Sequence, residues 1–314
     1  MAFLHHPPAH CLGFDVAKTT IAVSNGSAKA ARTITNSRRT IRSFLKANRP
    51  DFFVCEPTGG HELLLLEEAA KAGIACHRAD TNKLKGFIRS FGTHGKSDAI
   101  DAALLAAYGR ERWQILPLWR APDAQEARLR SLVRRRQELV TMRVAEQNRA
   151  KAPGNGELAA SFRAIIAILN RQVHALDAAI QALVDNTDAI RQRIEVCTSM
   201  NGIGLASAAA LLATLPELGS MTRRQAASLA GVAPHPNDSG LKKGYRKMRG
   251  GRPEVRTILF MPAIRAAAGH GEFAGFYKRL IARGKKPIAA VAAVMRKIVI
   301  TLNARLRSAA IPQS

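Results

Sequence analysis

The chain has 314 residues, with 48 Lys and Arg against 23 Asp and Glu, which gives a formal charge of +25. Hydrophobic residues make up 47% of it, enough to build real cores, and this excludes a disordered basic tail. A foldable chain with so large an excess of positive charge usually has a polyanion as its partner, so nucleic acid is the first candidate and an anionic membrane surface the second.

Membrane spans, secretion and cysteine-based scaffolds are disfavoured. The most apolar run, residues 288–295, ends at Arg296 and Lys297, short of the roughly 20 residues that a span needs. The first ten residues lack the basic start and long apolar core of a signal peptide. The four cysteines form no Cys-x-x-Cys pair. We therefore expect a cytoplasmic protein without a membrane partner.

The first third of the chain is expected to alternate strands and helices. Residues 11–26 fit two strands around a turn near Lys18, and residues 29–37 fit a third strand in an antiparallel meander. Helical spacing follows Ser37, which suits an N-cap, and a fully apolar strand ends at Glu56. The other expected elements are a helix over 61–73 closed by Gly73, a strand over 74–79, and helices around 82–91 and 96–111.

Two long helical segments follow, and then a second domain. Residues 123–151 are highly charged and free of Pro and Gly, the sequence APGNGE interrupts them, and a second helical run follows. This pattern predicts either a coiled-coil arm or an ordinary helical linker. From Cys197 onward the chain is rich in Ala and Gly and is expected to be mainly helical. The predicted domains are an N-terminal extension (1–10), an α/β domain (11–120), a helical coiled-coil arm (121–195) and a helical C-terminal domain (196–314).

Four carboxylates of the first domain stand at informative positions. Asp15 lies within the apolar first strand and Glu56 ends another, so burial would be costly without a partner or a metal. Asp98 and Asp101 are three apart on an expected helix and project from one face. Hard oxygen ligands select Mg²⁺ or Mn²⁺ over zinc, and a pair of such ions promotes phosphoryl transfer. A solvated edge residue or an ordinary helix-face acid is the plainer interpretation of each position alone.

Glycine and basic residues of the second domain suggest contacts to phosphate. Gly202-Ile203-Gly204 between helical stretches resembles a helix-hairpin-helix turn, whose backbone N–H groups contact a phosphate, although a tight helix connection has the same pattern. The expected nucleic-acid contacts are Lys18, Gly202, Gly204, Lys242, Lys243, Arg246, Lys247, Arg249 and Arg252.

Ser239 is the candidate nucleophile. It is flanked by Asp238 and Gly240 on an expected loop, and a serine hydroxyl beside dense positive charge suits attack on a phosphodiester. On spacing alone, a serine that stabilises a turn is the plainer interpretation. Residues 240–314 hold 17 Lys and Arg against two acids, so an excess of 15 positive charges lies downstream of this serine.

Two sets of motifs resemble one known family. GFDVAK, CEPTGG and KSDAIDA, in this order and spacing, resemble the N-terminal domain of the DEDD-type insertion-sequence transposases. That domain is similar to the RuvC-like Holliday-junction resolvases and has the ribonuclease-H-like fold. GVAPHPNDSG followed by a basic stretch resembles the serine-bearing C-terminal transposase domain of the same family.

The resemblance implies a site-specific DNA recombinase of the bacterial cytoplasm or nucleoid. It implies that Asp15, Glu56, Asp98 and Asp101 bind Mg²⁺, with Mn²⁺ as a substitute, and that Ser239 forms a transient phosphoserine link to DNA. It further implies an arm used in assembly, dimers that pair into tetramers, and a structured guide RNA that bridges donor and target DNA.

Three alternatives stay open. A RuvC-like metal-dependent nuclease or Holliday-junction resolvase would use only the four acids, with the C-terminal domain as a DNA clamp. An actin-like kinase is suggested by GFDVAKTT, but the further glycine-rich nucleotide loops that it needs are not found. A nucleoid-type architectural protein would bind DNA without Mg²⁺ and would tolerate loss of all four acids.

Overall fold

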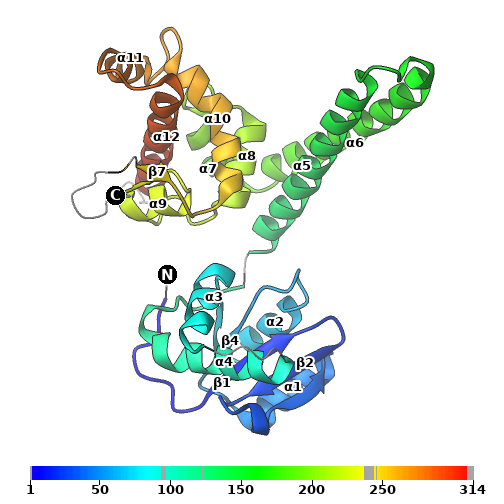
Figure 1. The fold of residues 1–314 in the computed structure, drawn as a ribbon, viewed down its shortest axis with the longest axis vertical. Helices are drawn as coiled ribbons and strands as arrows, with labels where there is room; N and C mark the ends of the chain where they lie inside the picture. Colours follow the sequence, from blue (N-terminus) through cyan, green and yellow to red (C-terminus); the bar gives the residue numbers. More distant parts are fainter. Residues whose placement is uncertain (1, 93–96, 122, 237–243, 245, 310–314) are drawn as a thin grey trace. The chain divides into compact units, whose positions relative to one another are not determined.

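The computed structural model describes residues 2–92, 97–121, 123–236, 244 and 246–309, and the chain divides into two compact units, Met1–Pro122 and Asp123–Ser314 (Figure 1). The first unit is mixed α/β and the second is mainly helical, which confirms the predicted class in outline. Three predicted site residues, Ser239, Lys242 and Lys243, lie outside the described residues. The finer division into an extension, an arm and a C-terminal domain stays a prediction.

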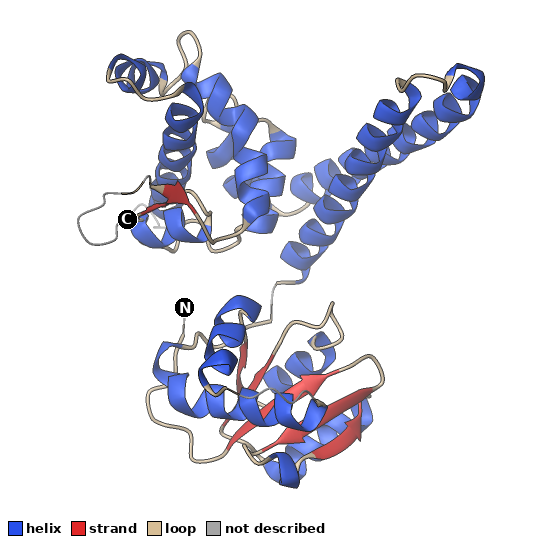
Figure 2. Ribbon diagram, in the orientation of Figure 1, coloured by secondary structure: helices blue, strands red, loops and turns tan. Residues whose placement is uncertain are grey.

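The first unit is built on a five-stranded sheet of order β3-β2-β1-β4-β5 (Figure 2). The first three strands pair antiparallel, as the predicted meander requires, and β4 and β5 continue parallel to β1. This arrangement is compatible with the ribonuclease-H-like fold that the sequence resemblance implies. The strands are β1 (Cys11–Val16), β2 (Thr20–Ser24), β3 (Arg32–Thr35), β4 (Phe52–Cys55) and β5 (Ala75–Arg78).

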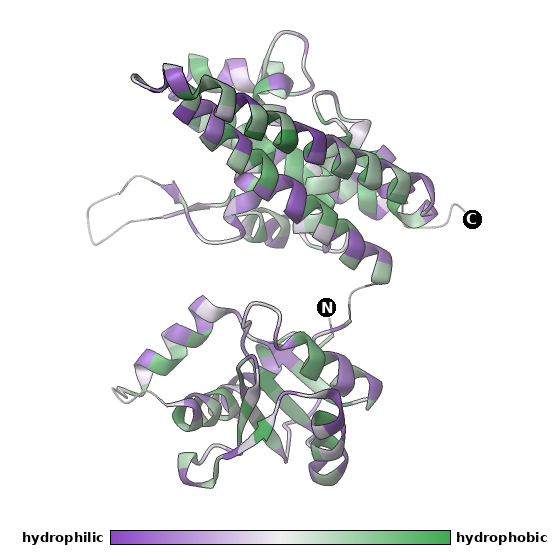
Figure 3. Cartoon of the chain, turned by 90° about the vertical axis from the view of Figure 1, so that its right-hand side faces the viewer, coloured by the Kyte–Doolittle hydropathy of each residue, from purple (hydrophilic) through white to green (hydrophobic). Residues whose placement is uncertain are grey.

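Helices cover both faces of this sheet. Alternate residues of β1 point to opposite faces, so Leu12 and Phe14 pack with α1 and α2, whereas Cys11 belongs to the core formed with α3 and α4. Figure 3 shows the apolar residues gathered on the strands between the helices. The helices are α1 (Arg38–Asn48), α2 (Leu63–Lys71), α3 (Thr81–Ser90) and α4 (Asp98–Arg112).

Local signals in the sequence explain where these helices begin and end. The Ser37 hydroxyl accepts a hydrogen bond from the Thr40 N–H and so caps α1 as predicted. Gly73, with φ of 68°, follows α2 in the left-handed conformation that ends helices. The caps therefore fix the helices at the positions that the sequence predicts.

The backbone of α4 lies directly against β1 because Gly13 has no side chain. A Cβ atom at Gly13 would stand 2.0 Å from the Ala102 carbonyl oxygen and 2.4 Å from the Ala106 nitrogen. A Cβ atom at Gly109 would stand 2.7 Å from the Cys11 Sγ. The later residue of the helix, Gly109, thus lies beside the earlier residue of the strand, Cys11. The helix therefore runs antiparallel to β1, and its N-terminal end lies toward the carboxyl end of the strand.

The second unit begins with two long helices that pack along each other. These are α5 and α6, and their shared core includes Leu139, Leu169 and Val173. The break at residues 152–157 separates them as predicted. The elements of this unit are α5 (Ala124–Ala150), α6 (Ala159–Asp185), α7 (Asp188–Thr198), α8 (Leu205–Thr214), α9 (Arg223–Leu229), β6 (Pro234–His235), β7 (Lys247–Met248), α10 (Pro253–Ala267), α11 (Ala274–Ala282) and α12 (Pro287–Ala309).

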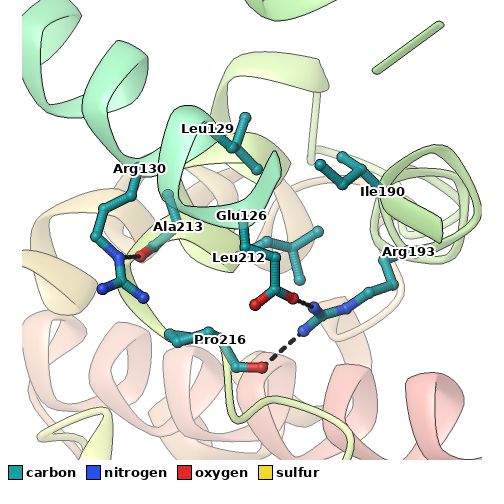
Figure 4. Close-up of a pocket in the computed structure, with 8 residues that line it drawn as sticks. All are labelled: Glu126, Leu129, Arg130, Ile190, Arg193, Leu212, Ala213 and Pro216. Atoms are coloured by element: carbon teal, nitrogen blue, oxygen red, sulfur yellow. Dashed lines mark hydrogen bonds and ion pairs between the residues drawn. The ribbon is translucent and has the colours of Figure 1, made fainter. Parts of the chain in front are cut away.

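Polar contacts fix the start of α5 to the other helices of its unit (Figure 4). Glu126 forms an ion pair of 2.7 Å with Arg193 of α7, which also donates to the Pro216 carbonyl at 2.8 Å. The Arg130 Nε donates to the Ala213 carbonyl of α8 at 3.3 Å. These groups line one small hollow, so the base of the long helix pair is anchored to α7 and α8.

The last helix of the second unit is apolar because it forms the centre of the core. By length and composition α12 is long and apolar enough to cross a membrane, and 39% of its most apolar window is buried inside the unit. Its buried residues include Val294, Ile298 and Leu302. Buried Asn303 accepts from the Gly219 N–H at 2.9 Å and donates to the Met221 carbonyl at 2.7 Å. The connection between α8 and α9 is thus fastened to this helix at two points.

The contact at Gly13 makes a prediction about stability. Replacing Gly13 by Ala places a methyl group inside the α4 backbone, so we expect a loss of about 3 kcal/mol in the free energy of unfolding. Gly86 is the matched control: it lies within α3 with open space around its Cβ position, so Gly86→Ala should stabilise the chain by about 1 kcal/mol. Urea unfolding of both variants measures the difference, and equal stabilities would contradict the close packing.

Candidate functional site

Asp15 and Glu56 stand at the same level on neighbouring parallel strands. The last paired residues of β1 and β4 are Phe14 and Cys55, and the two acids directly follow them. Because successive residues alternate between the faces of a sheet, Asp15 shares the α4 face with Cys11 and Gly13. The same alternation from Val54 assigns that face to Glu56. Both side chains are partly exposed, so the apolar setting that the sequence suggested does not bury them fully.

Asp98 and Asp101 occupy the first turn of α4, as predicted. Ser97 caps this helix by accepting from the Ile100 N–H at 3.3 Å. Since α4 runs antiparallel to β1, its first turn lies toward the strand end that carries Asp15. A helix N-terminus also favours negative charge. The four predicted acids therefore belong to one face and one end of the first unit.

The chemistry of these donors fits a hard divalent cation. Carboxylate oxygens are the ligands that Mg²⁺ and Mn²⁺ take, and partial exposure leaves them accessible. Across the described residues, however, no three His, Cys, Asp or Glu side chains are close enough together to hold a metal ion. Repulsion between four carboxylates favours such separation. The structure thus brings the acids to one region without forming a compact cluster.

Glu62, which the sequence analysis missed, is a buried carboxylate beside this region. One oxygen accepts from the Thr58 N–H at 3.0 Å, the Thr58 hydroxyl at 3.1 Å and the Gly60 N–H at 2.9 Å. The other accepts two hydrogen bonds from Arg78 of β5, at 2.6 and 2.9 Å. Glu62 therefore holds the Pro-Thr-Gly-Gly turn that directly follows Glu56.

The hydrogen bonds to Glu62 keep its carboxylate charged. Burial alone would raise its pKa, but the backbone hydrogen bonds and the charge of Arg78 outweigh burial and lower the pKa to about 2. With these donors around it, the carboxylate serves the fold. Nothing in the sequence distinguishes Glu62 from an exposed acid at a helix start, because its partner Arg78 lies 16 residues further along the chain, at the end of β5.

The other candidates of the first unit and of the glycine turn lie at the surface. Lys18 is exposed in the turn between β1 and β2. Gly202, with φ of 94°, lies between α7 and α8, and a Cβ atom there would stand 2.9 Å from the Arg265 Cβ. Gly204 caps the start of α8 and has open space around it. Gly202 is thus required by packing, whereas Gly204 leaves the N-terminus of α8 open.

A short ribbon brackets the segment that contains Ser239. Strands β6 and β7 pair antiparallel, His235 with Lys247 and Pro234 with Met248, a pairing that the sequence analysis did not predict. Two glycines lock the base of this ribbon: a Cβ at Gly251 would stand 2.3 Å from the Gly231 nitrogen. The base therefore has a defined backbone position.

The basic residues after Ser239 fall into two groups. Arg246, Lys247 and Arg249 are exposed. Arg252 instead forms two hydrogen bonds of 2.7 Å with the Glu217 carboxylate and donates to the Thr214 carbonyl at 2.7 Å. Burial would raise the pKa of Glu217, but Arg252 outweighs it and lowers the pKa. Arg252 therefore has a role in the fold, and its predicted contact with nucleic acid stays a prediction.

The lowered pKa of Glu62 predicts acid sensitivity. The pKa of Glu62 is about 2 in the folded chain and 4.5 ordinarily. Its charged carboxylate therefore stabilises the fold fully above pH 4.5, and this stabilisation is lost as the pH falls toward 2. For Glu62 this contribution is roughly 3 kcal/mol. Glu62→Gln should therefore lower stability at pH 7 and flatten its dependence on pH between 5 and 2. Urea unfolding against pH measures this, with exposed Glu67→Gln as the control, and an unchanged profile in Glu62→Gln would refute the assignment.

Two family models match this chain over the parts just described. A transposase model named for DEDD and IS110 matches residues 12–152, and the transposase model of the IS116/IS110/IS902 family matches residues 194–278. The first match contains the four acids, and the second contains the glycine turn, Ser239 and the basic residues that follow it.

Relatives support the same assignment. The chain is 28% identical over 232 residues to the pilin gene-inverting proteins of Moraxella bovis and Moraxella lacunata, which covers 71% of this chain and 70% of theirs. It is 32% identical over 160 residues to the insertion element IS110 uncharacterized 43.6 kDa protein of Streptomyces coelicolor, over 49% of this chain and 38% of that protein. The two models and these relatives together cover well over half of the chain, which belongs to the IS110 family of DEDD transposases.

Proposed function

We propose that this transposase cuts and rejoins DNA at specific sites with Ser239 as its nucleophile and with Asp15, Glu56, Asp98 and Asp101 as a metal-binding set. The observation that carries the proposal is that the four acids belong to one face and one end of the first unit. The relatives named for inversion of a pilin gene support recombination between defined DNA sites.

Ser239 would form a covalent bond to the DNA. Its hydroxyl oxygen attacks the phosphorus and loses its proton, the bond from phosphorus to the leaving DNA oxygen breaks, and that oxygen takes up a proton. The DNA strand is then held as a phosphoserine ester. Attack by the hydroxyl of a second strand reverses the step and frees the serine. The bond energy is retained throughout, so no ATP is needed.

The acids of the first unit would act on the same phosphodiester. A bound Mg²⁺ or Mn²⁺ supplies stabilisation of the charge that develops on its oxygens. Asp15 and Glu56 offer oxygen donors from two rigid strands, while Asp98 and Asp101 offer them from a capped helix turn. Sites on such elements hold their geometry better than sites on loops. The first unit thus supports a RuvC-like role within a ribonuclease-H-like fold.

Assembly and targeting complete the proposal. The helix pair α5–α6 would serve as a coiled-coil arm for dimers that pair into tetramers, and the α7–α8 turn would contact phosphate as a helix-hairpin-helix. A structured guide RNA would select donor and target DNA by base pairing. The protein itself would then contact mainly phosphates, which carry no sequence information. We place the protein in the bacterial cytoplasm or nucleoid as part of this proposal. The domain boundaries given in the sequence analysis are likewise part of it.

Replacing the serine separates this proposal from a metal-only nuclease. Ser239→Ala should reduce strand exchange by a factor on the order of 10⁴ or more, the usual scale for loss of a nucleophile. Gel assays of cleavage and of rejoined DNA, with Mg²⁺ present, give the two readouts separately. Ser220→Ala, on an exposed turn of the same unit, is the control and should keep both activities. If Ser239→Ala still cuts and exchanges strands, the serine mechanism is wrong; cutting without exchange would favour the resolvase alternative.

The two groups of basic residues predict different defects. Arg249 is exposed, so Arg249→Ala should leave the free energy of unfolding unchanged. It should reduce the salt dependence of DNA affinity, because each phosphate contact contributes about 0.9 to the slope of log K against the logarithm of the salt concentration. Arg252→Ala should lower the free energy of unfolding by about 3 kcal/mol, since it leaves Glu217 charged and half-buried without its partner. Fluorescence anisotropy at several salt concentrations and urea unfolding measure these effects. The reverse pattern in the two variants would contradict the division.

A further inference from the structure

A hollow in the first unit lies between the C-terminal parts of α1 and α2, and four cations line it. The other lining residues are Glu68 and four apolar residues, and the cations are Arg42, Lys46, Arg49 and Lys71. All four side chains belong to exposed residues. Holding so many like charges around one hollow costs repulsion, which an anionic ligand would relieve.

The one acid among the described residues that line the hollow is already neutralised. Glu68 is only 1% exposed in its side chain and is held by Arg38 at 3.0 Å, by Lys71 at 3.1 Å and by Arg42. The hydrogen bond from Arg42 lowers the pKa of this carboxyl, so it stays charged. Three cations share one carboxylate, which fixes Arg42 and Lys71 at the hollow and leaves a net positive charge there.

Arg49 gives an independent sign of function. Its φ and ψ are 42° and 59°, and it is the sole non-glycine residue with positive φ in the described part of the chain. It ends α1, where its N–H donates to the Leu45 carbonyl at 2.9 Å. Glycine adopts this conformation without strain, so an arginine at this position costs stability. Strained residues of this kind concentrate at ligand sites, and Arg49 lines the hollow.

The hollow is separate from the four acids. Residues Arg49 and Pro50 lead into the amino end of β4, whereas Asp15 lies next to the last residue of β1 and Glu56 directly follows β4, both at the carboxyl ends. Helices α1 and α2 cover the face of the sheet opposite to α4. The hollow and the acids therefore lie on opposite faces and at opposite ends of the sheet.

We infer that this hollow is a second nucleic-acid site, which grips the phosphodiester backbone through Arg42, Lys46, Arg49 and Lys71. The phosphates of a nucleic-acid backbone are the ligands that suit these four cations, since the single acid beside them is already neutralised. Contacts to phosphates alone do not require that any base be recognised. Both DNA and structured RNA carry this backbone. The inference depends on a nucleic-acid partner for the family but not on Ser239 or on the metal-binding set.

The test uses the full chain in EDTA, so that no catalysis enters. The variant Lys46→Ala/Arg49→Gly removes two cations that Glu68 does not hold, and Lys29→Ala/Arg32→Ala removes two exposed cations from the β3 edge as a matched control. We expect the first variant to bind nucleic acid more weakly, and the slope of its log K against the logarithm of the salt concentration to fall by about 2. The affinity and the slope of the control variant should change little. Arg49→Gly alone should raise Tm by a few degrees while it weakens binding, so misfolding cannot explain the loss.

Two probes distinguish the source of the backbone. A DNA duplex and an RNA hairpin of equal length are compared, and weaker binding of either one or of both supports the site and names its ligand. Acetylation of lysines provides a second readout: bound nucleic acid should protect Lys46 and Lys71 but not Lys29. Equal affinity and salt slope in the two double variants, with no protection of Lys46, would overturn the inference. Loss of strand exchange in Ser239→Ala is a separate result and bears only on the proposed mechanism.

Discussion

The first unit depends on the direct contact between the backbone of α4 and strand β1. Gly13 and Gly109 leave no room for a side chain between the two elements, so the direction and level of the helix are fixed relative to the strand. This one constraint determines that the first turn of α4 lies toward the end of β1 that carries Asp15. Two stretches of sequence more than 80 residues apart thereby contribute acids to one region.

Acids in this basic chain serve two different purposes. Glu62, Glu68 and Glu217 are buried or half-buried, each is held by arginines, and each fastens a turn or a helix. Their pKa values are lowered by hydrogen bonds, from backbone N–H groups and Arg78 to Glu62 and from basic side chains to Glu68 and Glu217. Asp15, Glu56 and the α4 acids lie at element ends with partial or full exposure, where a cation and a phosphodiester can reach them. Pairing with arginine thus identifies Glu62, Glu68 and Glu217 as acids that serve the fold.

Much of the fold was predictable from local patterns, and the parts that were not depend on distant partners. Strand alternation, the Ser37 cap and the glycine after α2 are read within a few residues, and the structure confirms them. Strands β6 and β7 have two residues each, too short for any periodicity. The roles of Glu62 and Arg252 come from partners 16 and 35 residues away, which no local pattern indicates. The order of the four acids pointed to one region, whereas their distances from each other depend on packing that a pattern does not contain.

The central claim is that one reaction needs both the serine of the second unit and the acids of the first. Its most direct test is mass spectrometry of the protein after denaturing quench of a reaction with cognate DNA, Mg²⁺ and co-purified RNA. The account predicts a nucleotide adduct on the peptide that contains Ser239 in the wild-type chain, and its loss in Asp15→Asn, which removes the charge of that side chain and keeps its size. Recombination that proceeds without any adduct on Ser239, or an adduct that forms equally well in Asp15→Asn, would contradict it.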